Sequence, residues 1–136
     1  MAEGEFNFGS AKDLKPGRYV IIDEIPCRIV SIDTSKPGKH RAAKMRIVAI
    51  GIFDGQKKNL LTSSDGDIHI PVINKFNAQV ISLSGDTVQL MNKDTFEMFE
   101  AYVPEDLKVD VVEGRDVEVM ESMGRKAIVR VFKAGE

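Results

Sequence analysis

The chain has 136 residues, of which 43% are hydrophobic and 29% charged, and its net charge is −2. This length suits one medium globular domain or two small ones. The regular pattern of hydrophobic residues excludes a disordered chain. Its single cysteine, Cys27, excludes an intramolecular disulfide and favours a reducing, cytoplasmic compartment. The chain lacks the run of about 18 apolar residues that a membrane helix needs, so we expect no membrane partner.

Alternating side chains predict five short strands in the first half, at residues 19–23, 27–34, 44–53, 58–62 and 68–72. Asp54-Gly55 and Asp65-Gly66 tolerate positive φ, so neighbouring strands are expected to pair as hairpins or tight meanders. Five strands in about seventy residues predict a small closed barrel.

The pattern restarts after Pro71 with five more strands, at residues 76–84, 87–91, 96–103, 116–123 and 126–132. A short helix is predicted between the third and fourth of these, because Pro104 opens a segment with acids in its first turn and Gly114 follows its end. The interior of this segment also alternates like a strand. Five strands with a helix after the third match the Greek-key barrel known as the OB-fold.

The two halves differ in charge. Residues 1–70 carry 11 Lys/Arg and 9 Asp/Glu, a net charge of +2, whereas residues 71–136 carry 8 and 12, a net charge of −4. Together with the strand break at Pro71, this predicts an all-β protein with two domains, residues 1–71 and 72–136; one 136-residue sandwich is the competing architecture. Residues 34–53 contain five basic and no acidic residues: Lys36, Lys39, Arg41, Lys44 and Arg46.

The sequence gives little support for a metal site or for nucleophilic catalysis. The soft ligands are Cys27, His40 and His69, and none has zinc-like spacing with another. Cys27 has apolar neighbours typical of a buried strand position, and no serine lies in a GxSxG turn. We therefore predict that the chain is not an enzyme, with no catalytic residue, no metal and no bound cofactor.

Gly38-Lys39 invites comparison with a phosphate-binding loop, in which GxxxxGK is followed by Ser or Thr and a helix. Asp33 occupies the position of the first glycine and His40 that of the hydroxyl residue. The residues that follow are strand-like, where a helix N-terminus is required. A nucleoside triphosphatase is therefore not supported.

Residues 35–42, which we call the lysine loop, lie between two predicted strands. Pro37 and Gly38 fit the central positions of a type II turn, which would project Lys39 from an exposed tip. From the residues alone, two interpretations stay open. The loop either contacts phosphates or is a solvated turn with incidental charge.

The loop closely resembles the modification loop of the translation initiation factor 5A family. The residues that carry the resemblance are Thr34-Ser35-Lys36-Pro37-Gly38-Lys39-His40 followed by Ala43-Lys44. Residues 14–17, 25–30 and 51–58 are also similar to the family, and the resemblance covers essentially the whole chain. Many eukaryotic members of the family have Gly-His at the positions of Arg41-Ala42. Together with Pro37, these residues make the chain look like an archaeal member.

The resemblance implies an SH3-like barrel followed by a C-terminal OB-fold. It also implies that deoxyhypusine synthase converts Lys39 to deoxyhypusine by adding a covalent spermidine-derived extension. In many members of the family the final product is hypusine. The implied partners are the ribosome, its rRNA and the acceptor end of peptidyl-tRNA, where the factor would promote peptide-bond formation on stalled ribosomes. The loop residues expected to contact tRNA or rRNA are Lys36, Gly38, His40, Arg41, Lys44 and Arg46.

Two other classes of function stay in view. A general RNA-binding module would bind free RNA without modification, and the negative net charge argues against it. A structural assembly protein of the same architecture need not retain the modifiable lysine, which this chain has.

Overall fold

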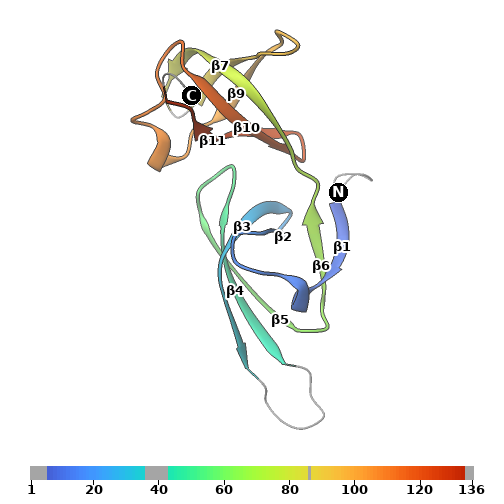
Figure 1. Cartoon of the computed structure of the whole chain (residues 1–136). Helices are drawn as coiled ribbons and strands as arrows, with labels where there is room; N and C mark the ends of the chain where they lie inside the picture. The colour runs from blue at the N-terminus through green and yellow to red at the C-terminus, as the bar shows by residue number, and fades with distance from the viewer. Residues whose placement is uncertain (1–5, 36–42, 86, 134–136) are drawn as a thin grey trace. The chain divides into compact units, whose positions relative to one another are not determined.

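The computed structural model describes residues 6–35, 43–85 and 87–133. The chain divides into two compact units, Met1–Val72 and Ile73–Glu136 (Figure 1). Five residues predicted for the candidate site lie outside the described residues: Lys36, Gly38, Lys39, His40 and Arg41.

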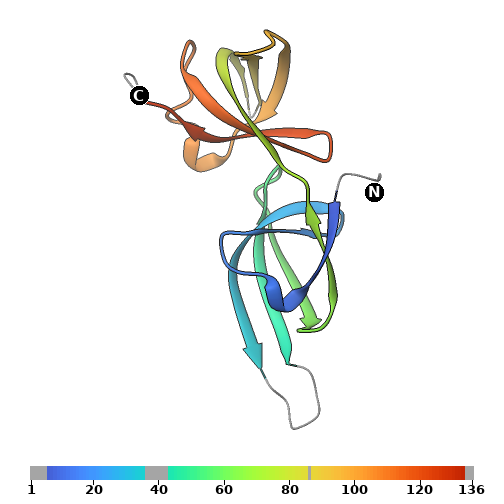
Figure 2. The same ribbon diagram turned by 45° about the vertical axis from the view of Figure 1, so that its right-hand side comes forward.

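The described residues of the N-terminal unit form six strands in two antiparallel sheets, which we call the two ladders. One is a four-stranded sheet in the order β2-β3-β4-β5, and the other pairs β1 with β6 (Figure 2). The strands are β1 (Phe6–Ser10), β2 (Tyr19–Ile22), β3 (Ile25–Ser35), β4 (Lys44–Gly51), β5 (Lys57–Ser63) and β6 (Asp67–Pro71). A 3-10 turn, η1 (Ala11–Asp13), follows β1.

The five strands predicted here are present with slightly shifted ends, whereas β1 was not predicted. The closed barrel predicted for this half is a half-barrel, because the two ladders share no hydrogen-bonded neighbour. Side chains join them instead: Val20, Ile47 and Ala49 of the sheet share one buried cluster with Ile68 of β6. Burial of this apolar surface is the main force holding the ladders together.

The C-terminal unit is a closed five-stranded barrel in the order β10-β11-β9-β8-β7. A parallel pair between Ala127 and Tyr102 closes it, and its core contains the fully buried Leu90, Val117 and Ile128. The OB-type barrel predicted from sequence is thereby confirmed. The strands are β7 (Asn74–Ser84), β8 (Thr87–Asn92), β9 (Met98–Tyr102), β10 (Asp116–Ser122) and β11 (Arg125–Val131).

The helix predicted after β9 is reduced to a 3-10 turn, η2 (Glu105–Leu107). Val111 is buried and Leu107 packs against the barrel core, while Val109 between them is 88% exposed. Three valines at positions 109, 111 and 112 also disfavour a helix, because β-branched side chains lose χ1 freedom there. The segment therefore packs against the barrel core through Leu107 and Val111 and contains little helical structure.

We expect Ile47→Ala to lower the free energy of unfolding by about 2–5 kcal/mol, because Ile47 is fully buried and its truncation leaves a cavity. Val48→Ala is the matched control, since Val48 lies one residue along β4 on the opposite face and is half-buried. It should cost about 1 kcal/mol or less. Urea unfolding of both variants gives the comparison, and equal losses would contradict the alternation assigned to β4.

Candidate nucleic-acid interface

The lysine loop joins the ends of β3 and β4. Ser35, the last residue of β3, pairs directly with Lys44, the first residue of β4. Lys44 also pairs with Ser63 of β5, so three strands meet at this end of the sheet. The loop is thus inserted between two strands whose ends are held in a fixed register.

Backbone hydrogen bonds hold this end of the sheet. The carbonyl oxygen of Ala43 accepts a hydrogen bond from the backbone N–H of Ser64 at 2.7 Å, and the carbonyl oxygen of Ser64 accepts one from the N–H of Lys12 at 3.0 Å. We call these two bonds the backbone relay. The relay connects the residue after the lysine loop to the β5–β6 turn and to η1, which fixes where the loop leaves the sheet.

Lys44 and Arg46 are the two predicted contact residues that the structure describes, and both are exposed. Their neighbours Met45 and Ile47 are 4% and 0% exposed, because successive side chains of a strand point to opposite faces. Arg46 pairs with Asp33 of β3 and Leu61 of β5. The two cations therefore lie on the solvent face of the sheet, beginning where the lysine loop ends.

Cys27 lies in the core of the N-terminal unit and is fully buried. Its thiol donates a hydrogen bond to the carbonyl oxygen of Ile25 at 3.2 Å. Burial raises the pKa of this thiol from 9.0 to about 11, chiefly because a buried thiolate would lose its hydration. Cys27 is therefore a packing residue and a poor nucleophile at neutral pH.

We expect Cys27 to react with a water-soluble disulfide reagent in the unfolded protein and to be unreactive at pH 8 in the folded one. Because the folded state raises the pKa of this thiol, its effect on stability is absent below pH 9 and becomes destabilising as the pH rises from 9 towards 11. Thiol titration and urea unfolding from pH 8 to 11 measure both effects. Cys27→Ala should remove the second effect, and labelling at the unfolded rate in native buffer would contradict the burial.

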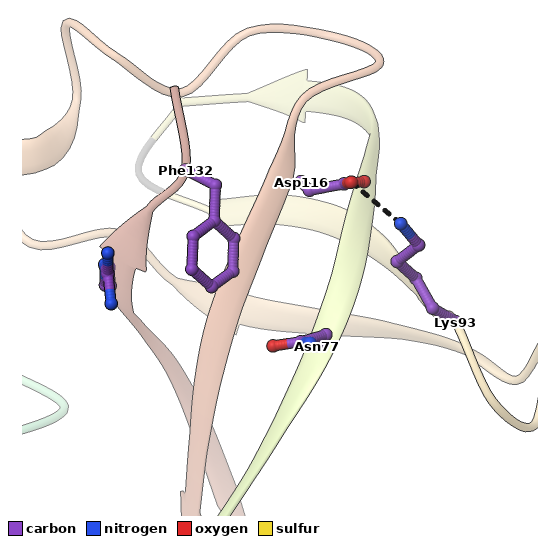
Figure 3. A pocket seen from close by; sticks show the side chains of 5 residues that line it. Asn77, Lys93, Asp116 and Phe132 are labelled. Carbon is purple, nitrogen blue, oxygen red and sulfur yellow. Dashed lines mark hydrogen bonds and ion pairs between the residues drawn. The ribbon is translucent and has the colours of Figure 1, made fainter. Parts of the chain in front are cut away.

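A pocket of about 480 Å³ lies on the C-terminal barrel (Figure 3). Lys93 Nζ lies 2.7 Å from Asp116 Oδ2, and the guanidinium of Arg130 lies over the ring of Phe132 at 4.9 Å.

Glu118 pairs in register with both Asn77 and Arg130, so a second carboxylate lies on the same face. Two cations and two carboxylates offset each other, which makes this pocket a weaker phosphate site than the loop end of the N-terminal sheet. The residues that line it are Asn77, Lys93, Asp116, Arg130 and Phe132.

Among the described residues, no group of three or more His, Cys, Asp and Glu side chains could hold a metal ion. In the same part of the chain, no helix is long and apolar enough to cross a bilayer.

Two family descriptions match the chain and together span most of it. Residues 8–66 match the family described as translation initiation factor 5A-like, N-terminal. Residues 72–131 match the family described as eukaryotic elongation factor 5A hypusine, DNA-binding OB fold.

Archaeal relatives match over nearly the whole chain. The translation initiation factor 5A of Archaeoglobus fulgidus is 48% identical over 120 residues, which cover 88% of this chain and 94% of the relative. That of Pyrococcus furiosus is 48% identical over 122 residues, covering 87% and 88%. Among solved structures, eukaryotic translation initiation factor 5A from Methanococcus jannaschii matches with a TM-score of 0.85 and 38% identity over 97% of this chain and 98% of that one.

Proposed function

The chain belongs to the translation initiation factor 5A family, and we propose that its action in translation depends on a deoxyhypusine or hypusine formed at Lys39. The observation that carries this proposal is the sequence at residues 34–40, which begins in the last two residues of β3 and continues into the segment between the paired ends of β3 and β4. Deoxyhypusine synthase is the expected modifying enzyme, and the cytoplasm is the expected compartment.

The proposed extension adds an aminobutyl group and a second amine to the lysine side chain. This gives the loop longer reach and further positive charge and hydrogen-bond donors, which suits a confined nucleic-acid site better than lysine alone. The fixed strand ends support the proposal, because a long side chain needs a rigid base to deliver its amine to one place.

We propose the acceptor end of peptidyl-tRNA as the target of the modified lysine, on the ribosome and beside its rRNA. Holding that end in a reactive geometry would promote peptide-bond formation on stalled ribosomes by a proximity effect. No acid, base or nucleophile of this chain is required, which agrees with the buried thiol of Cys27. The relatives are likewise named as translation factors.

Lys39 is expected to carry the added mass of an aminobutyl-type extension in protein purified from its native cells. Peptide mass spectrometry across residues 36–44 measures it. Lys36 and Lys44 in the same peptides are internal controls and should be unmodified. Protein made in a host without the modifying enzyme gives the unmodified reference. An unmodified Lys39 in every native peptide would contradict the proposal and leave a basic-loop binding protein.

Lys39→Arg should lower the rate of peptide-bond formation on proline runs to the level of unmodified protein, because arginine keeps the charge but cannot receive the extension. Lys75→Arg in the C-terminal unit is the matched control and should retain full activity, since Lys75 is exposed on β7. A reconstituted translation assay with modified protein measures the rates. Full activity of Lys39→Arg, or equally tight binding of unmodified protein to free RNA, would favour a general RNA-binding module instead.

A further inference from the structure

The solvent face of the four-stranded sheet carries cations beyond those at its loop end. Arg28 of β3 and Lys57 of β5 both pair with Ile50 of β4. Residues paired across a sheet share a face, and Ile50 lies an even number of positions from Lys44 and Arg46. Arg28, Lys44, Arg46 and Lys57 therefore lie on one surface, which we call the outer sheet face, and all four are exposed.

The outer sheet face is elongated along β4. Lys44 stands at the loop end, between Ser35 and Ser63, and Ile50 stands near the other end between the two further cations. Six residues of extended strand separate these rows, about 20 Å. The cations thus extend from the lysine loop along most of the sheet.

Few acids oppose these cations. Asp33, opposite Arg46, is the one carboxylate at the paired positions of this face in β3, β4 and β5. Asp54, close to Lys57 in sequence, lies 3.5 Å from the ammonium of Lys58, which compensates its charge. The face therefore has an excess of positive charge, in contrast to the pocket of the C-terminal barrel, where cations and carboxylates balance.

The face also offers groups that suit the rest of a nucleotide. Leu61, beside Arg46, is 65% exposed, an apolar surface for a ribose or base. Ser35 and Ser63 flank Lys44 with hydroxyl groups, which are common contacts to phosphate and sugar. Cations, hydroxyls and the exposed side chain of Leu61, with the half-buried Val48 and Ile50 on the same face, are a combination that fits a nucleic-acid backbone.

We propose that the outer sheet face binds the phosphate backbone of an RNA segment that continues from the lysine loop along β4. Arg46 contacts it near the loop, and Arg28 and Lys57 contact it at the far end. The identity of the RNA as tRNA or rRNA rests on the proposed function, whereas the contact itself rests on the charge and register of the sheet. It extends the RNA contact well beyond the residues next to the loop.

The test measures binding of the full chain to ribosomes carrying peptidyl-tRNA as a function of salt concentration. In the variant Arg28→Gln/Lys57→Gln, loss of two phosphate contacts should reduce the slope of log K against log salt by about 1.4–1.8. If the affinities of variant and parent converge at about 1 M salt, this slope change makes binding roughly 25- to 60-fold weaker at about 0.1 M salt. The matched control is Lys75→Gln/Arg125→Gln, which removes two exposed charges from the C-terminal unit and should leave the slope unchanged. Thermal unfolding of both variants verifies that the fold is retained.

Combining Arg28→Gln/Lys57→Gln, and separately its control, with Lys39→Ala separates this proposal from the proposed function. A further loss in that background supports a sheet contact independent of the loop. If Lys39→Ala weakens binding but Arg28→Gln/Lys57→Gln behaves like its control, the sheet contact is overturned and the loop function stands. If the sheet variant loses affinity for ribosomes but not for protein-free tRNA and rRNA, the face binds an acidic protein, which also overturns the proposal.

Discussion

The two-residue alternation of β4 is the constraint on which the rest of the N-terminal unit depends. Met45, Ile47 and Ala49 fill the core, while Lys44 and Arg46 remain in water. A slip of one residue would bury two charges without partners and expose three apolar side chains. The cost of that exchange fixes the register with β3 and β5, and the register in turn fixes where the lysine loop begins and which cations share a face.

Much of the fold could be predicted from the sequence, because the signals for most strands are local. Alternation and Gly-containing turns identified ten of the strands. Strand β1 was missed because Gly9 and Ser10 dilute a short pattern, and its partner β6 is distant in the chain. Segment 104–114 was overestimated as a helix because its terminal signals are helix-like, whereas its packing uses two anchors, Leu107 and Val111.

The sequence likewise predicts some residues of the candidate site and not others. The lysine loop is visible in sequence because its characteristic residues are contiguous, and Lys44 and Arg46 follow it directly. Arg28 and Lys57 belong to different strands and become neighbours only through their shared partner Ile50. The pocket of the C-terminal barrel likewise combines distant residues, and no local pattern indicates it. Cross-strand register is a tertiary property that a single sequence does not reveal.

The backbone relay has an evolutionary consequence. Its donors and acceptors are the main-chain groups of Ala43, Ser64 and Lys12, which nearly every amino acid supplies. Substitution at these positions can therefore accumulate without loosening the end of the sheet, proline at the two donor positions excepted. Changes in the side chains around the lysine loop are therefore compatible with an unchanged attachment of the loop to the sheet.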